Sequence, residues 1–322
     1  MSFVDMDEAE LLRYTGQNEK PDDFDAFWEE GIREMEALGT EAEFRKADFQ
    51  VQNAECFDLY FQGVGGSTIH GVYVRPAHIK EPLPAVLEFH GYSASCCGFR
   101  GHLCWTTAGF CIAGMDCRGQ GGFSDDLTPV HGTTLRGHII RGLRDGDPRK
   151  MYFRNVFLDT AQFARIIAAL PEVDQTRIGA EGGSQGGGLA SVCAALTPWI
   201  SRLAIQYPFL SDYHRAWSMH MNSGPYMEIN DYFRTYDPRH LREKEIFTKL
   251  GYIDIQHFAS RIQAKVRMYT GLMDTVAPPS TQFAMYNKIV APKDYQLYPD
   301  FGHEYLPGQQ EDVMQFMQEM VK

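Results

Sequence analysis

The sequence has 322 residues, of which 44% are hydrophobic and 22% charged, the balance of a soluble globular protein with a large core. With 30 basic and 42 acidic residues the formal net charge is −12, which argues against nucleic acid or an anionic membrane as the main partner. A neutral ligand such as a sugar or an ester is not excluded.

The N-terminal stretch MSFVDMDEAELLRY has neither the basic segment nor the apolar core of a signal peptide. No apolar run reaches the roughly 18 residues that a membrane-spanning helix needs. We therefore expect a cytoplasmic protein with no membrane partner.

The next element is an amphipathic helix. Its apolar residues recur every three or four positions, at Phe24, Phe27, Trp28, Ile32, Met35 and Leu38. Pro21 and two aspartates precede it, as is typical of a helix N-terminus. We expect residues 1–45 to form a helical extension that packs on the main body.

From about residue 56 the chain alternates short apolar runs with helical patterns. CFDLYFQ and TIHGVYVRP flank Val64-Gly65-Gly66-Ser67 and predict a strand hairpin. Six further runs predict strands: PAVLEFHG, GFCIAGMDCRG, TRIGAEGGS, RLAIQYPF, VRMYTGLMD and YQLYPDFGHE. Helical spacing occurs in VFLDTAQFARIIAAL, after Ser184, and from about Gln309 to Met320. This alternation predicts an α/β fold, with a mostly parallel sheet covered by helices on both faces.

Residues 211–250 break this rhythm after the sixth predicted strand. The segment is polar and aromatic, and we expect an inserted interface segment over the strand ends rather than a second domain. The whole chain, 1–322, is interpreted as a single domain.

Seven cysteines are present, five of them at positions 96, 97, 104, 111 and 117. This cluster contains no C-x-x-C pair, so its spacing does not favour a zinc site. We expect buried free thiols in a reducing compartment, and neither a metal nor another cofactor.

The central motif is Gly182-Gly183-Ser184-Gln185-Gly186, a G-x-S-x-G sequence between a predicted strand and a predicted helix. A nucleophilic serine needs a sharp strand-to-helix turn, and glycines on either side leave room for it. A glycine-rich loop of this kind can also bind phosphate, but neither a Walker A sequence nor G-x-G-x-x-G is present. The motif predicts Ser184 as a nucleophile in an α/β-hydrolase fold.

An α/β-hydrolase orders its catalytic residues as serine, acid, histidine. His303 follows the last predicted strand, where the general base must stand. Asp274 follows the preceding strand and is the favoured acid, while Asp254 and Asp300 are its rivals. The predicted oxyanion donors are the backbone N–H groups of Gln185 and Tyr92.

Three spaced motifs resemble the signature of carbohydrate esterase family 7, the acetyl xylan esterases and cephalosporin C deacetylases. They are Arg118-Gly119-Gln120-Gly121-Gly122, Gly182-Gly183-Ser184-Gln185-Gly186 and His303-Glu304. HGY at 90–92, YPFLSD at 207–212, GLMDTVAPPS at 271–280 and the N-terminal PDDFDAFW are also similar to that family. The resemblance covers nearly the whole chain.

The resemblance implies a metal-free, intracellular serine esterase that removes acetyl groups from short xylo-oligosaccharides and from cephalosporin C. It implies a triad of Ser184, Asp274 and His303, with Tyr92 and Gln185 as oxyanion donors. Structural support would come from the buried Arg118 and from Gly119, Gln120, Gly121, Gly122, Gly182, Gly186 and Glu304. It also implies a homohexamer whose active sites face an internal chamber, with 211–250 helping to form the contacts.

Three other functions remain open on the sequence: a peptidase of the prolyl-oligopeptidase type, a broader carboxylesterase, and a binding or scaffolding module without turnover. The chain has no room before residue 56 for the propeller domain that such peptidases usually carry. Tyr92 and the aromatic residues of Tyr207-Pro208-Phe209 are candidates for the walls of a tight acyl pocket, although these rings can equally belong to the core.

Overall fold

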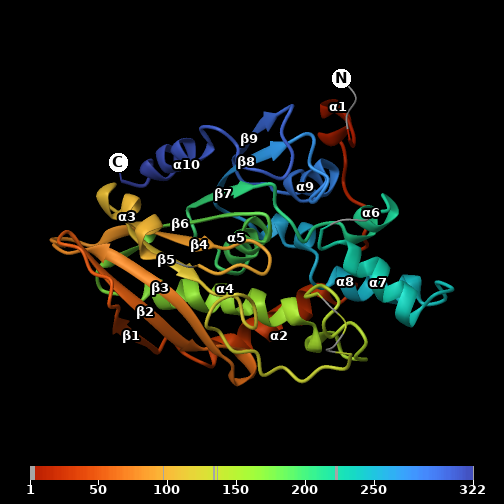
Figure 1. Cartoon of the computed structure of the whole chain (residues 1–322), viewed down its shortest axis with the longest axis horizontal. Helices are drawn as coiled ribbons and strands as arrows, with labels where there is room; N and C mark the ends of the chain where they lie inside the picture. Colours follow the sequence, from red (N-terminus) through yellow and green to blue (C-terminus); the bar gives the residue numbers. More distant parts are fainter. Residues whose placement is uncertain (1–3, 97, 133–134, 136, 222–223, 322) are drawn as a thin grey trace.

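One twisted sheet runs through the molecule (Figure 1). The computed structural model describes residues 4–96, 98–132, 135, 137–221 and 224–321. Within them the strands are β1 (Ala42–Lys46), β2 (Ala54–Gln62), β3 (Thr68–Pro76), β4 (Leu83–Phe89), β5 (Cys111–Met115), β6 (Val173–Gly183), β7 (Arg202–Gln206), β8 (Lys265–Gly271) and β9 (Lys293–Tyr298).

The strand order is β1-β2-β3-β5-β4-β6-β7-β8-β9. The β1–β2, β2–β3 and β3–β5 pairs are antiparallel, and every pair from β5 across to β9 is parallel. The predicted α/β class with a mostly parallel sheet is confirmed. Parallel strands end at one common edge, so the loops that follow β4, β6, β8 and β9 meet there.

Helices cover both faces of the sheet. The larger apolar core joins one face to α2 (Phe24–Glu36), α4 (Tyr152–Ala168), α5 (Gln185–Leu196) and α9 (Pro279–Tyr286). A smaller core lies on the other face, under α3 (Phe99–Thr107) and α10 (Gln309–Gln318). Single turns of 3₁₀ helix occur at Val64–Gly66, Pro148–Lys150, Ile255–His257 and Ala259–Arg261.

The predicted N-terminal helix is α2. Its apolar face is buried, and Trp28 has no exposed surface. The Trp28 ring lies 5.9 Å from that of Phe157 in α4, and its Nε1–H donates to the Tyr252 carbonyl at 2.9 Å. Residues from the N-terminal segment are therefore part of the main core.

The sequence predicts a helical extension over residues 1–45 and does not predict strand β1 at its end. Its sequence AEFRK is short and mostly charged, and only Ala42, Phe44 and their neighbours on β2 mark an inward face. An edge strand with one partner needs little apolar periodicity, so its sequence signal is weak.

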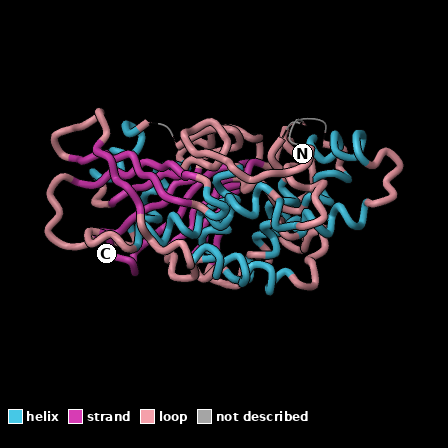
Figure 2. Tube along the Cα trace, turned by 90° about the horizontal axis from the view of Figure 1, so that it is seen from below, coloured by secondary structure: helices cyan, strands magenta, loops and turns pink. Residues whose placement is uncertain are grey.

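The segment between β7 and β8 holds α6 (Tyr213–Ser218), α7 (Met227–Tyr236) and α8 (Glu243–Gly251), on the right of Figure 1. Tyr226, Ile229, Tyr232 and Phe233 from this segment are buried in the larger core. Seen from below, the strands gather toward the end that holds the C-terminus, whereas helices dominate the other end (Figure 2). The short α1 (Glu8–Leu11) lies near the N-terminus.

Candidate active site

Ser184 stands on a sharp turn between β6 and α5. Its backbone has φ 56° and ψ −121°, a conformation that residues other than glycine adopt only under strain. A Cβ at Gly186 would overlap the Phe89 carbonyl of β4, and one at Gly182 would overlap the backbone of Gly186. Glycine at these two positions lets strand and helix approach closely enough to form the turn.

Ser184, His303 and Asp274 form one hydrogen-bonded chain. His303 Nε2 lies 2.9 Å from Ser184 Oγ, and His303 Nδ1 lies 2.8 Å from Asp274 Oδ2. A carboxylate only accepts, so the Nδ1–H donates to Asp274 and Nε2 is left to accept from the serine hydroxyl. This is the arrangement that a histidine general base requires.

Asp274 reaches His303 because β8 and β9 are parallel neighbours. Asp274 is fully buried, and its Oδ1 accepts the N–H groups of Val276 and Ala277 at 2.8 and 2.9 Å. The rival Asp254 is engaged elsewhere, since its Oδ1 accepts the Asp212 N–H at 3.0 Å.

Tyr92 and Gln185 come together from neighbouring strands. Gln185 is the first residue of α5, where the leading N–H groups have no partner within the helix. Its side chain donates to the Gly91 carbonyl at 3.4 Å, which ties the start of α5 to the loop that carries Tyr92. His90 supports this loop, because its Nε2 accepts the Cys117 N–H at 3.0 Å and its Nδ1–H donates to Gly91 O at 2.7 Å.

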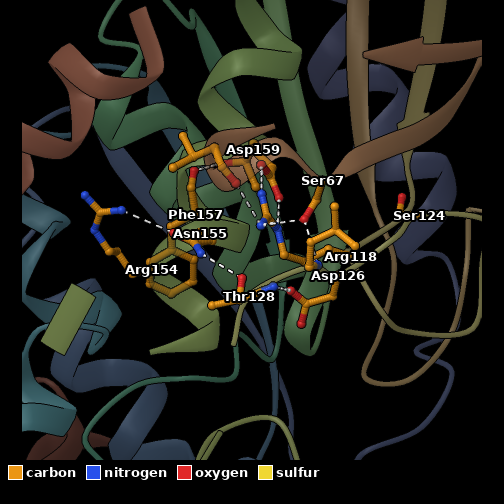
Figure 3. Close-up of polar contacts among 12 residues, drawn as sticks. Ser67, Arg118, Ser124, Asp126, Thr128, Arg154, Asn155, Phe157 and Asp159 are labelled. Carbon is orange, nitrogen blue, oxygen red and sulfur yellow. Dashed lines mark hydrogen bonds and ion pairs between the residues drawn. The ribbon is translucent and has the colours of Figure 1, made fainter. Parts of the chain in front are cut away.

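Arg118 is completely buried and forms a two-pronged ion pair with Asp159 of α4 (Figure 3). Its Nε and one terminal nitrogen donate to the carboxylate at 2.7 and 2.6 Å. The other terminal nitrogen donates to Val64 O at 3.0 Å and to Ser67 Oγ at 3.2 Å. The guanidinium thus joins the hairpin turn, α4 and the loop after β5, and it is not free to touch a substrate.

The rest of the Arg118–Gly122 motif packs against the site. Gln120 exchanges two amide hydrogen bonds with Gln185, at 2.9 and 3.1 Å, and accepts the Ser93 N–H at 2.8 Å. Gly119 has φ +60°. A Cβ at Gly121 would press on the Ser93 and Ala94 carbonyls, and one at Gly122 would overlap the Asp116 carboxylate.

Glu304 is exposed and accepts the Gly302 N–H at 3.0 Å, so it orders the loop on which His303 stands.

Two aromatic residues also lie near the site. The Tyr207 ring is 4.2 Å from the His303 ring, whereas Phe209 is fully buried and packs edge-on against Tyr92 at 5.9 Å. Tyr207 therefore borders the reacting groups directly, and Phe209 belongs to the core behind them.

Sequence reasoning missed Glu228 of α7. Its carboxylate is 6% exposed and accepts hydrogen bonds from the Tyr92 hydroxyl and from the Ile139 N–H. Burial raises the pKa of Glu228 to about 7. The available signal was its place on the apolar face of α7, four residues before Tyr232.

Among the described residues, His70, Cys96 and Asp116 are grouped closely enough to hold a metal ion. Asp116 already accepts the His70 Nδ1–H at 2.7 Å and the N–H groups of Cys96 and Phe123 at 2.7 and 3.1 Å. These contacts satisfy its oxygens and join β3 to the loops after β4 and β5. Cys104 is exposed, the other described cysteines are buried free thiols, and Cys97 lies outside the described residues.

A serine facing a histidine that is paired with a buried aspartate, at the carboxyl edge of this sheet, defines a serine hydrolase of the α/β-hydrolase fold. The chain belongs to the acetyl xylan esterase (AXE1) family, whose profile matches residues 1–320. The resemblance seen in the sequence is confirmed, and so is the expected enzyme class, a carboxylic ester hydrolase.

Acetyl xylan esterase 1 from Thermoanaerobacterium sp. JW/SL YS485 is 50% identical, with a TM-score of 0.97 over 99% of this chain and 100% of that one. An acetyl xylan esterase from Paenibacillus sp. R4 is 35% identical, with a TM-score of 0.93 over 98% and 99% of the two chains. The acetyl esterase Axe7A of Xylanibacter ruminicola is 27% identical over 91% of this chain. This chain spans 65% of the length of Axe7A.

Within the described residues, no helix has the length and apolar character needed to cross a membrane.

Proposed function

We propose that the protein is a serine esterase that hydrolyses acetyl esters through an acetyl-serine intermediate. The observation that carries this proposal is the chain from Ser184 through His303 to Asp274, with donor–acceptor distances of 2.9 and 2.8 Å. Membership of the acetyl xylan esterase family supports the choice of an acetyl ester.

In the first half-reaction His303 takes the Ser184 proton while the serine oxygen attacks the acetyl carbonyl carbon. The backbone N–H groups of Tyr92 and Gln185 stabilise the oxyanion. His303 then gives the proton to the leaving alcohol, which departs and leaves acetyl-Ser184. Asp274 holds the imidazole tautomer and stabilises the imidazolium without taking the proton itself.

In the second half-reaction His303 accepts a proton from water, and the resulting hydroxide attacks the acetyl carbonyl. Collapse of the second tetrahedral intermediate breaks the bond to Ser184 Oγ, which recovers its proton from His303. Acetic acid leaves and gives its own proton to the solvent to become acetate. The same groups serve both halves, so a cofactor is not part of the proposal.

We propose acetylated short xylo-oligosaccharides and cephalosporin C as substrates, on the strength of the three family motifs. We also propose a cytoplasmic homohexamer. The family resemblance supports the hexamer, and the buried free thiols fit a reducing compartment. Light scattering coupled to size-exclusion chromatography tests the assembly, because a mass near that of one 36.6 kDa chain would contradict it.

The decisive experiment measures acetate release from p-nitrophenyl acetate, cephalosporin C and an acetylated xylo-oligosaccharide, for wild type and Ser184→Ala. We expect Ser184→Ala to lose on the order of 10⁴-fold or more in kcat. Ser191→Ala is the matched control. Ser191 lies on the same helix and is buried, but its hydroxyl donates to the Gly187 carbonyl at 2.7 Å, so activity should persist.

Activity surviving in Ser184→Ala would overturn the mechanism. A longer acyl ester and a peptide amide complete the substrate panel. Efficient cleavage of the long ester would indicate a broader carboxylesterase, and preferential cleavage of the amide would indicate a peptidase. No turnover of any substrate would leave the binding or scaffolding function.

A further inference from the structure

Glu228 is a buried carboxylate that contacts the oxyanion loop, residues 90–94 after β4, which carries Tyr92. It lies in α7 on the same face as Ile229, Tyr232 and Phe233, all of them buried. Among the described residues its hydrogen-bond partners are a phenol and backbone N–H groups, with no lysine or arginine. A carboxyl group in such surroundings loses its hydration. Its burial therefore costs free energy unless both oxygens make hydrogen bonds within the protein.

Each oxygen of Glu228 has a different partner. One accepts the Tyr92 hydroxyl, and the other accepts the Ile139 N–H at 2.9 Å. The Tyr92 hydroxyl oxygen in turn accepts the His138 N–H at 2.6 Å. Tyr92 is therefore linked at its tip both to α7 and to the 138–139 backbone.

The backbone at Gly137 lies close against this carboxylate. A Cβ at Gly137 would overlap the Glu228 carboxyl group, and Gly137 has φ +102°, where other residues are strained. The Tyr92 ring is also confined, because the rings of His138 and Phe209 lie 4.9 and 5.9 Å away.

A tyrosine side chain has only two torsions between its Cα and its ring, so fixing its hydroxyl restricts the orientation of its own backbone. The Gly91 carbonyl, which shares a peptide group with the Tyr92 N–H, accepts a hydrogen bond from the Gln185 side chain at 3.4 Å. Tyr92 is thus anchored on both sides of its N–H group.

We propose that Glu228 is a positioning residue, which aims the Tyr92 N–H at the oxyanion by clamping the Tyr92 hydroxyl. This inference rests on the proposed function, because it assumes that Tyr92 donates to an acetyl oxyanion. An oxyanion contact strengthens in the transition state, so a badly aimed donor lowers kcat and leaves KM nearly unchanged.

The test compares Glu228→Gln, Tyr92→Phe and the double variant on p-nitrophenyl acetate. Tyr92→Phe keeps the ring and the backbone N–H and removes only the clamped hydroxyl. Since losing a whole donor costs on the order of 10²–10³-fold, we expect each single variant to lose about 10-fold to 100-fold in kcat, with KM within about twofold of wild type. The double variant should be no slower than the worse single variant, because both changes break one clamp.

Asp254→Asn is the matched control. Asp254 is also a fully buried carboxylate, but it bonds to Asp212 and Gln256 and does not touch the oxyanion loop. A merely structural role for Glu228 predicts that both variants lower the melting temperature and neither changes kcat. Our inference predicts that only the Glu228 variant lowers kcat.

An unchanged kcat in Glu228→Gln, a rise in KM alone, or additive losses in the double variant would each overturn the inference. If Glu228→Gln does not fold, Tyr92→Phe decides the question by the same kcat criterion. These outcomes are independent of the proposed function, which fails only if wild type does not release acetate or if Ser184→Ala still does.

Discussion

The side chain of Asp274 has a defined partner for each of its oxygens. Two backbone N–H groups hold Oδ1, and Oδ2 faces His303 at 2.8 Å. Asp274→Asn keeps this shape if its oxygen remains on the backbone donors, but then its NH₂ group points at Nδ1. The imidazole would then have to carry its proton on Nε2. A protonated Nε2 cannot accept the proton of the Ser184 hydroxyl.

We expect Asp274→Asn to lower kcat by on the order of 10⁴ at neutral pH. Initial rates of p-nitrophenyl acetate hydrolysis measure the loss, and a far-UV circular dichroism spectrum identical to wild type shows that the fold is retained. Near wild-type turnover would contradict the assigned role of Asp274.

Arg118 is expected to contribute to stability rather than to chemistry. Both Arg118 and Asp159 are completely buried, so removing one leaves the other charge without a partner or water. We expect Arg118→Ala to lower the free energy of unfolding by about 3–5 kcal/mol, measured by urea denaturation. Arg242→Ala is the control, because its ion pair with Glu245 is about half exposed, and its unfolding midpoint should stay within error of wild type.

At the scale of elements, Asp212 attaches the N-terminal segment to α6. Its carboxylate accepts the Tyr14 hydroxyl at 2.7 Å and the N–H groups of Gln17 and Asn18 at 3.0 and 2.9 Å. The same residue has φ +48° and caps α6, so one side chain serves both elements. This carboxylate therefore ties residues 14–18 to the start of α6, and Asn287 adds a hydrogen bond to the Tyr14 carbonyl at 2.8 Å.

We expect Asp212→Ala to free residues 14–18, with amide hydrogen exchange at Gln17 and Asn18 faster by at least about tenfold, since each loses a hydrogen bond to a charged acceptor. Hydrogen-exchange mass spectrometry of the N-terminal peptide measures this. Asp212→Asn tolerates the left-handed backbone and keeps one acceptor oxygen, so it should give a smaller effect. Equal protection in wild type and Asp212→Ala would refute the attachment.

At the scale of the whole molecule, buried ionisable groups set the pH dependence of stability. Burial raises the pKa of Asp254 to about 7. Partial burial and the neighbouring Glu88 carboxylate raise the pKa of Glu181 to about 8. The folded protein therefore binds protons that the unfolded chain has released above pH 4.5, and stability from these groups is lost as pH rises toward 8.

Two histidines act in the opposite direction, the half-buried His138 and the buried His257. Burial lowers the pKa of His138 to about 4 and of His257 to about 3, so their contribution grows as pH rises and becomes constant above their ordinary value of 6.5. Above pH 6.5 the effect of the carboxyl groups remains, and the raised pKa values of His70 and His102, which pair with carboxylates, act in the same direction. We expect the melting temperature to fall from pH 6.5 to 8, with a shallower fall in Asp254→Asn, as measured by differential scanning calorimetry. A flat or rising profile would contradict this assignment.

The sequence by itself determined the fold class, the position of the serine turn, and the two loops that carry Asp274 and His303. Each of these signals is local: an apolar run gives a strand, a helical pattern follows, and a glycine pair permits the turn between them. Parallel strands place the residues that follow them at one edge of the sheet, so the meeting of Ser184, Asp274 and His303 needs no further long-range information.

Only the tertiary structure decided which distant groups became partners. Glu228 meets Tyr92 across 136 positions, and Arg118 meets Asp159 across 41. Strand β1 likewise exists because β2 offers it an edge. Such pairings depend on how α7, α4 and the loops pack together, and burial then excludes water and makes each partner obligatory. The residue types in the sequence show that such groups are present, but not which of them come into contact.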